Sequence, residues 1–240
     1  MIIDGKKIAD EITQNLSLKV QEFKSLIGRA PKLAIVLVGD DPASKIYVNL
    51  KVKKAQEIGI ETEIRQDLDT DADGIIVQLP GGEDFINQIP LEKDVDGLRE
   101  GSPFLPATVK AILVILASEA RPESTYVIVG QGRLVGKPLV DYLEKNNFKV
   151  IRCDEFTKNL KQKTLQADVL VVATGVENLI KKDMVKKGVI LIDCGAPKPE
   201  INSEAYEMAS AYTPVPGGVG PVTVVSLLEN LVEATYNKLS

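Results

Sequence analysis

Strands and helices alternate through the second half of this 240-residue chain. Four runs rich in β-forming residues are separated by three helical stretches. The runs lie at residues 126–129, 148–152, 169–172 and 189–192, and the helical stretches lie at residues 136–146, 158–166 and 181–187. This alternation is typical of a doubly wound parallel sheet. It predicts an α/β domain, to which we assign residues 119–220.

The first half of the chain predicts a second α/β domain. Two helices each begin at an aspartate cap and end at a glycine: residues 4–27 between Asp4 and Gly28, and Pro42 to Ile58 between Asp41 and Gly59. Three β-rich runs, at residues 32–38, 62–65 and 74–79, predict strands.

The domain boundary is expected after a helix over residues 107–117. The polar break Ser118–Thr125, which contains Pro122, is the candidate linker. A final helix over residues 221–238 is expected to pack back on the first domain, so that residues 1–118 and 221–240 belong together.

The link between the second and third strands is unusually short. Asp67–Asp73 has about seven residues, whereas a crossover between parallel strands normally needs about a dozen. Either the strands at 62–65 and 74–79 are not parallel neighbours, or their crossover has no helix.

Composition excludes several classes of function. A net charge of −5 argues against broad contact with nucleic acid or an anionic membrane. Cys153 and Cys194 are too few for a disulfide framework, residues 1–10 have no signal-peptide core, and the longest apolar run, 111–117, is too short to span a bilayer. We therefore expect a cytoplasmic protein. Histidine is absent, so imidazole catalysis, serine triads and histidine-bound metals are excluded, and we expect no metal site.

A glycine-rich turn follows the strand TYVIV and precedes a helix. Its sequence, Gly130-Gln131-Gly132-Arg133-Leu134-Val135-Gly136, has the spacing GxGxxxG, one residue longer than the commonest dinucleotide fingerprint. Such a turn is often only a turn, but Asp154 ends the next strand where a ribose hydroxyl is usually bound. This context favours a Rossmann-type dinucleotide-binding domain. Its candidate cofactor-binding residues are Gly130, Gln131, Gly132, Arg133, Val135, Gly136, Asp154, Thr174 and Gly175.

Polar residues in the first domain have both structural and functional interpretations. Ser44, Tyr47 and Lys51 share one helix face, and the simplest interpretation of this pattern is a solvated lysine on an amphipathic helix. Asp94 and Asp96 precede Gly97, as solvated caps often do. Gln78 lies in an apolar strand, where it is either a satisfied structural amide or a group directed into a site.

Five segments, in order along the chain, resemble one family. They are Gly39-Asp40-Asp41-Pro42-Ala43-Ser44 with Tyr47-xxx-Lys51, Gly74-Ile75-Ile76-Val77-Gln78-Leu79-Pro80, Lys93-Asp94-Val95-Asp96-Gly97, Val135-Gly136-Lys137-Pro138, and Thr213-Pro214-Val215-Pro216-Gly217-Gly218-Val219-Gly220-Pro221. The sequence resembles the bifunctional methylenetetrahydrofolate dehydrogenase/methenyltetrahydrofolate cyclohydrolase family. The resemblance implies NAD(P)-dependent oxidation of 5,10-methylenetetrahydrofolate, hydrolysis to 10-formyltetrahydrofolate, and a homodimer.

The same resemblance implies roles for individual residues. Lys51 would be the catalytic lysine, Gln78 would hydrogen-bond and tune it, and Asp96 would hold the pterin. Tyr47 would stack on the folate with support from Ser44. The turn that begins with Pro216, Gly217 and Gly218 would contact substrate in a cleft between the domains.

The sequence also departs from the family pattern near the folate site. Gly81-Gly82 stands where the family usually has Leu-Pro, and only Pro106 and Thr108 remain of a Pro-Cys-Thr-Pro-x-Gly segment. The short link at 67–73 omits a helix and loop that the family normally has. Two alternatives therefore stay open: a dehydrogenase without cyclohydrolase activity, and a non-catalytic protein that binds folate or dinucleotide.

The resemblance also bears on the choice of dinucleotide. NADP-preferring relatives have an arginine and a serine where this chain has Gln131 and Gly132, and a histidine and a serine where it has Asp154 and Glu155. Carboxylates repel a 2′-phosphate, whereas an aspartate accepts hydrogen bonds from a free ribose diol. We therefore expect NAD rather than NADP, although Arg133 could still reach a phosphate and Asp154 could merely cap the next helix.

Overall fold

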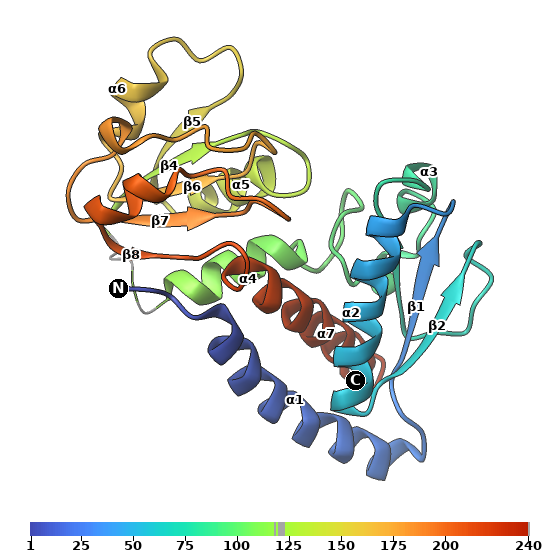
Figure 1. Cartoon of the computed structure of the whole chain (residues 1–240). Coiled ribbons are helices and arrows are strands. Elements are labelled where there is room, and N and C mark those ends of the chain that lie inside the picture. Colours follow the sequence, from blue (N-terminus) through green and yellow to red (C-terminus); the bar gives the residue numbers. More distant parts are fainter. Residues whose placement is uncertain (118, 120–122, 240) are drawn as a thin grey trace. The chain divides into compact units, whose positions relative to one another are not determined.

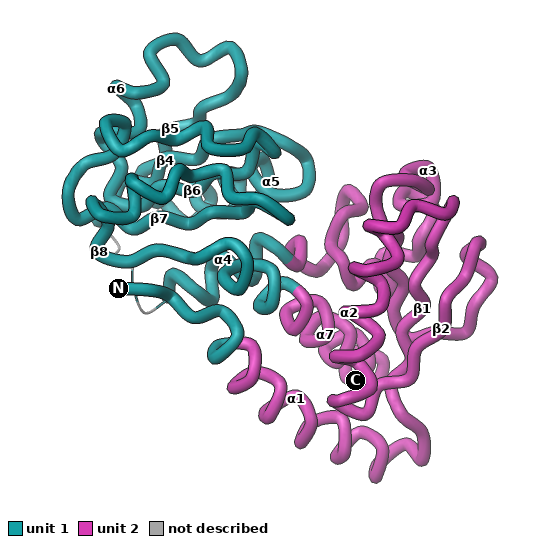
Figure 2. The backbone as a smooth tube through the Cα atoms, in the orientation of Figure 1, with its two compact units in different colours: residues 1–8, 108–223 teal, residues 9–107, 224–240 magenta. Residues whose placement is uncertain are grey.

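The computed structural model describes residues 1–117, 119 and 123–239. The chain forms two compact units, one of residues 1–8 and 108–223 and the other of residues 9–107 and 224–240 (Figure 2). Residues 1–8, 108–117 and 221–223 thus group with the second α/β unit, not with the first as we expected. Half of the candidate linker Ser118–Thr125 lies outside the described residues, and its last residue already begins a strand.

The unit of residues 9–107 and 224–240 contains a three-stranded parallel sheet. Its strands are β1 (Lys32–Leu37), β2 (Glu61–Arg65) and β3 (Gly74–Gln78), in the order β2-β1-β3. Because β1 lies between them, β2 and β3 are not neighbours, which was the first of our two alternatives. The second also holds, since the described residues 66–73 form bends and extended chain without a helix.

The two faces of this sheet are covered differently. One packs on α1 (Gly5–Ile27), α2 (Pro42–Ile58) and α7 (Val219–Asn237), whose apolar residues surround Leu33 and Ile35 of β1 (Figure 1). The other face is covered by the link itself, through Leu68 and Ala72, and by the short helix α3 (Glu83–Ile86). The link therefore covers part of this face without a helix.

Polar contacts fix the link in place. The buried Asp73 carboxylate accepts two hydrogen bonds from the Arg29 guanidinium, at 2.7 and 2.8 Å, and one from the Lys32 backbone N–H at 3.0 Å. Burial raises the pKa of Asp73, but Arg29 and its other partners outweigh burial and hold that pKa below its usual value. Asp71 pairs with the Lys32 ammonium at 2.6 Å, and the Thr70 hydroxyl donates to Glu63. These contacts make the link an ordered connection.

The cap residues explain where α1 and α2 begin and end. The Asp4 carboxylate accepts from the N–H groups of Lys6 and Lys7, and the Asp41 carboxylate accepts from that of Ser44. Gly28 (φ 78°) and Gly59 (φ 91°) follow the helices in the left-handed conformation.

The other unit contains a five-stranded parallel sheet. Its strands are β4 (Thr125–Val129), β5 (Lys149–Cys153), β6 (Val169–Val172), β7 (Val189–Asp193) and β8 (Ala209–Tyr212), in the order β5-β4-β6-β7-β8. Connecting helical segments are α5 (Gly136–Lys145), α6 (Leu160–Thr164), η2 (Lys182–Met184) and η3 (Ser203–Met208), and α4 (Ala107–Leu116) precedes the sheet. This is the predicted doubly wound α/β class.

Two local predictions for this unit were wrong, and one strand was missed. The stretch 181–187 is only the three-residue helix η2, because Val185 is extended and buried in the core. The predicted helix 158–166 shrinks to α6, since Asn159 takes a left-handed conformation just before it (φ 59°). Strand β8 was missed because its sequence, ASAY, is short and weakly apolar. No helix in the described part of the chain is long and apolar enough to cross a membrane.

Candidate active site

Lys51 and Gln78, which lie 27 residues apart in sequence, meet in the structure. The Lys51 ammonium, on α2, donates a hydrogen bond of 3.0 Å to Oε1 of Gln78, the last residue of β3. The amide nitrogen of Gln78 donates to the Leu79 carbonyl at 2.7 Å. The buried amide is therefore satisfied at both ends, and it also fixes the position of the lysine.

The electrostatics of the site couple Lys51 to Asp96. Removal from bulk water lowers the pKa of Lys51, and the Asp96 carboxylate opposes this shift. Burial raises the pKa of Asp96, the Lys51 cation opposes that rise, and Asp94 adds to it. Both residues are half-buried, with their charged groups largely removed from bulk water. Such coupled, perturbed groups are typical of functional sites.

The two aspartates of the KDVDG motif have different environments. Asp94 is 1% exposed, and its carboxylate accepts from the Arg99 backbone N–H at 2.8 Å. Burial raises its pKa. Asp94 therefore has a structural role, although as a buried carboxylate and not as the solvated cap that we considered, and Asp96 remains the site candidate.

Ser44 and Tyr47 lie on the first turns of α2. Ser44 is 2% exposed, and its N–H belongs to the Asp41 cap, so it helps to begin the helix. Tyr47 is 40% exposed and precedes Lys51 by one helical turn. Its ring is available to a planar ligand. Beyond β3, Gly81 (φ 104°) and Gly82 (φ 71°) both adopt a left-handed backbone that leucine and proline would resist.

The glycine turn brings the ends of β4 and β6 together. A Cβ on Gly130 would lie 2.1 Å from the Ala173 carbonyl oxygen, and one on Gly136 would lie 1.8 Å from that of Gly130. The sheet order reverses between these two strands, which is where doubly wound proteins bind ligands. Gly132 and Arg133 are exposed on the turn, and Val135 precedes α5.

Gln131 and Asp154 lie at neighbouring strand ends. The Gln131 amide donates to the carbonyls of Ile128 (3.2 Å), Gly130 (3.1 Å) and Cys153 (3.4 Å), so it points inward. The exposed Asp154 accepts through Oδ1 from the Phe156 N–H and the Thr157 hydroxyl. Since α6 begins only at Leu160, Asp154 does not cap it.

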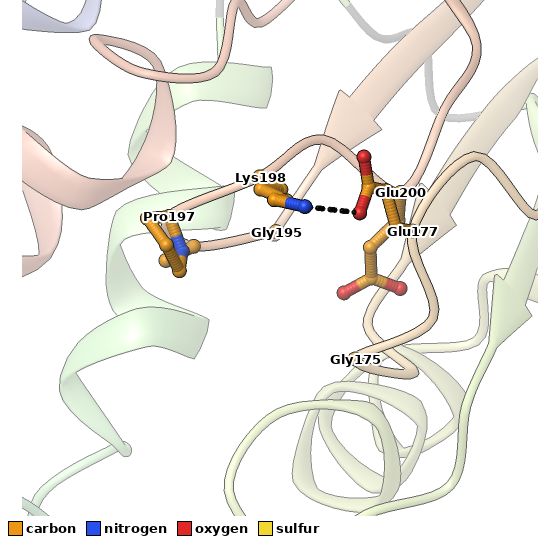
Figure 3. Close-up of a pocket in the computed structure, with 7 residues that line it drawn as sticks. Gly175, Glu177, Gly195, Pro197, Lys198 and Glu200 are labelled. Carbon is orange, nitrogen blue, oxygen red and sulfur yellow. Dashed lines mark hydrogen bonds and ion pairs between the residues drawn. The ribbon is translucent and has the colours of Figure 1, made fainter.

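A hollow of about 250 Å³ lies at the carboxyl ends of β6 and β7 (Figure 3). It includes the predicted Gly175, and Thr174 adjoins it through a hydrogen bond to Glu200. Its lining residues are Gly175, Glu177, Gly195, Ala196, Pro197, Lys198 and Glu200. Sequence reasoning missed residues 195–200, although Gly195, two residues after the end of β7, was a usable signal.

The third group of predicted residues forms a tight turn before α7. Gly217 has a φ of 106°, and a Cβ on Gly218 would lie 2.6 Å from the Pro214 carbonyl oxygen. A Cβ on Gly5 would lie 1.8 Å from the Gly218 carbonyl oxygen, so the N-terminal segment packs on this turn. Pro216 to Gly218 belong to the unit with the glycine turn, whereas Lys51, Gln78 and Asp96 belong to the other.

A parallel sheet of this order with a glycine turn at its switch point defines a dinucleotide-binding α/β protein. The NAD(P)-binding domain model of tetrahydrofolate dehydrogenase/cyclohydrolase matches residues 106–239, and the catalytic domain model matches residues 3–71. The chain belongs to the tetrahydrofolate dehydrogenase/cyclohydrolase family, which confirms the resemblance found in the sequence.

Similar proteins cover the chain from end to end. The bifunctional protein FolD of Caldanaerobacter subterraneus subsp. tengcongensis is 38% identical, over 98% of this chain and 96% of the relative. The bifunctional protein FolD of Bacillus velezensis is 38% identical, over 100% of this chain and 99% of the relative. The crystal structure of the bifunctional enzyme from Campylobacter jejuni has a TM-score of 0.92 at 34% identity and covers 99% of both chains.

The chain is internally shorter than these relatives. The alignment with the Caldanaerobacter protein has 273 positions, but 98% of this chain is about 235 residues, so about 38 positions fall opposite gaps. The catalytic domain match ends at residue 71, within the short link after β2. The difference in length from this relative is therefore internal to the alignment.

Proposed function

We propose that the protein oxidises 5,10-methylenetetrahydrofolate with NAD(P) and hydrolyses the product, 5,10-methenyltetrahydrofolate, to 10-formyltetrahydrofolate. The contact between Lys51 and Gln78, with Asp96 close enough to influence the lysine charge, carries this proposal. Family membership and full-length similarity to bifunctional relatives support it.

The oxidation places modest demands on the protein. A bound nicotinamide dinucleotide supplies the hydride acceptor. Loss of hydride from a carbon between two nitrogens leaves a resonance-stabilised cation, so the step needs alignment of the donor carbon and no base. We assign Tyr47 to stacking on the folate and Ser44 to supporting the turn that carries it. The turn of Pro216, Gly217 and Gly218 supplies further substrate contacts.

The hydrolysis needs a group that moves protons. A neutral lysine amine can accept a proton from the attacking water and later give it to the departing ring nitrogen. Burial favours that neutral form of Lys51. Because Gln78 Oε1 accepts an N–H, the amine lone pair stays available for water.

Asp96 is assigned to the pterin, whose aminopyrimidine edge presents two adjacent N–H donors to a carboxylate. We expect Asp96→Asn to weaken folate binding by about 1.5–3 kcal/mol, the usual cost of losing a charge-assisted hydrogen bond. Folate titration calorimetry and urea denaturation of the same variant check this. If folate affinity is unchanged while stability drops, Asp96 is a structural turn residue like Asp94.

Product analysis tests the proposed function directly. The purified protein is supplied with methylenetetrahydrofolate and either NAD or NADP, and the methenyl and formyl products are followed separately. We expect both products. Methenyl alone identifies a monofunctional dehydrogenase, and neither product with intact ligand binding identifies a binding protein.

The finer assignments rest on the sequence and on local geometry. We propose that the dinucleotide contacts Gly130, Gly132, Arg133 and Val135 to Gly136, with Asp154 at its ribose and Thr174 and Gly175 at its other half. NAD is the proposed partner, since a carboxylate at 154 disfavours a 2′-phosphate. We also propose a cytoplasmic homodimer that binds neither nucleic acid nor membrane, in keeping with a net charge of −5 and two unpaired cysteines.

A further inference from the structure

The loop after β7 is folded around a buried carboxylate. Asp193, the last residue of β7, accepts hydrogen bonds from the backbone N–H groups of Gly195 (2.8 Å), Glu200 (3.0 Å) and Ile201 (2.9 Å). These bonds turn the loop back on itself. They deliver Glu200, which is 3% exposed, to the carboxyl end of β6.

Glu200 uses only one of its two carboxylate oxygens within the chain. Oε2 accepts hydrogen bonds from the backbone N–H and the hydroxyl of Thr174, both at 2.6 Å. Oε1 has no hydrogen bond to any residue that the structure describes, and Glu200 lines the hollow between the loops after β6 and β7 (Figure 3). Glu200 is 3% exposed as a residue, but Oε1 is not a fully buried atom without a partner, so it is open to the hollow and can accept a hydrogen bond from a ligand there.

The size of the hollow restricts that ligand. About 250 Å³ is less than a whole dinucleotide needs, but a cavity of about 150 Å³ already holds a benzene ring. A single aromatic ring with a small polar substituent therefore fits. The substituent must offer a hydrogen to Oε1, since a carboxylate only accepts.

The direction of the dinucleotide identifies the ring. Asp154 at the end of β5 is the candidate ribose contact, and the glycine turn follows β4. A dinucleotide that continues across the switch point reaches β6 and then β7, so its second half lies over the hollow. That half ends in nicotinamide, a single ring with an N–H-bearing carboxamide.

We propose that Glu200 binds the carboxamide N–H of the nicotinamide ring in the hollow between the loops after β6 and β7. The assignment rests on the proposed dehydrogenase function and adds a residue that recognises the carboxamide of the cofactor. It also affects which redox form of the cofactor binds more tightly. The oxidised ring carries a positive charge that the reduced ring lacks, so the carboxylate favours the oxidised form.

Binding measurements on the wild-type chain test the hydrogen bond without any substitution. The probes are NAD⁺ and its 3-acetylpyridine analogue, in which a methyl ketone replaces the carboxamide and removes the N–H donors. We expect calorimetry to give NAD⁺ an affinity at least about tenfold higher. Equal affinities would overturn the proposal.

The variant Glu200→Gln tests the charge. Its amide oxygen can still accept both Thr174 donors, so the loop keeps its anchor. We expect the NAD⁺ dissociation constant to rise by about tenfold or more, that of NADH to rise less, and that of ADP-ribose, which lacks the ring, to stay within about twofold. The exposed Glu204→Gln is the matched control and should bind all three ligands like the wild type.

The outcomes separate this proposal from the function on which it rests. If Glu200→Gln weakens NAD⁺, NADH and ADP-ribose equally, Glu200 only supports the Thr174 loop and the proposal is wrong. If the wild type binds none of these ligands and no NADP⁺ or NADPH either, the proposed dehydrogenase function itself is wrong.

Discussion

Lys51→Met is expected to reduce hydrolysis of methenyltetrahydrofolate by about 10²–10⁴-fold, the usual contribution of a general acid–base. Hydride transfer should fall much less, because that step moves no proton at the lysine. Methionine fills a similar volume without a charge, and the Gln78 amide is left without its lysine partner. The two activities are measured separately, as loss of the methenyl compound and as reduction of the dinucleotide.

The pH dependence gives a second measure of the same residue. Burial lowers the pKa of Lys51 below the 10.5 of a free lysine, so the neutral base forms at lower pH. Hydrolysis should therefore rise with pH through that lowered pKa and level off above it. The Asp96 carboxylate raises the pKa of Lys51, so Asp96→Asn should move this rise to lower pH.

The same shift predicts an effect on stability. A group that binds its proton less tightly when folded makes folding less favourable wherever it is protonated in both states. The free-energy cost of folding that comes from Lys51 is thus fully present below the pKa of Lys51 in the folded protein. It disappears as the pH rises toward 10.5, the pKa of a free lysine. Lys51→Met should remove this pH dependence of the unfolding free energy.

Lys53→Met is the matched control for these experiments. Lys53 is an exposed lysine on the same helix, so its loss should leave both activities and their pH profiles unchanged. Wild-type hydrolysis by Lys51→Met, with the fold intact, would show that the proton is moved by another group.

Local chemistry in the sequence was enough to predict the main elements. Asp41 and Gly59 bound α2 as their side-chain and backbone preferences require. The α/β class followed from the alternation of strands and helices. The family motifs also suggested that Lys51 and Gln78 act together, and the structure places them in contact.

Features that depend on tertiary packing were not predictable in this way. The sequence does not reveal that β1 lies between β2 and β3. Both explanations of the short link therefore stayed open until the strand order was known. The role that we propose for Glu200 depends on three backbone hydrogen bonds to Asp193 and on a threonine 26 residues away, which no local pattern encodes. The inward turn of the Gln131 amide was missed for the same reason.

The wild-type protein is expected to use NAD at least about tenfold more efficiently than NADP, judged by kcat/KM with each dinucleotide. Asp154 is exposed at the end of β5, and its Oδ2 has no hydrogen bond to any described residue, so it can accept from a ribose diol. The same carboxylate repels a phosphate dianion. Salt screens an exposed repulsion, so the preference should weaken as ionic strength rises.

The double variant Asp154→Ser with Gln131→Arg should reverse this preference. Gln131 contacts the carbonyl of Cys153, the residue before Asp154, so the two substitutions act at adjacent points at the carboxyl ends of β4 and β5. Serine removes the repulsion, and an arginine can bind the 2′-phosphate through two parallel hydrogen bonds. Each single variant should shift the ratio of efficiencies part of the way, and Arg133→Met measures whether the native guanidinium already contributes. A wild-type preference for NADP, or a double variant whose ratio does not move toward NADP, would mean that the 2′-position of the ribose is read by residues other than 131 and 154.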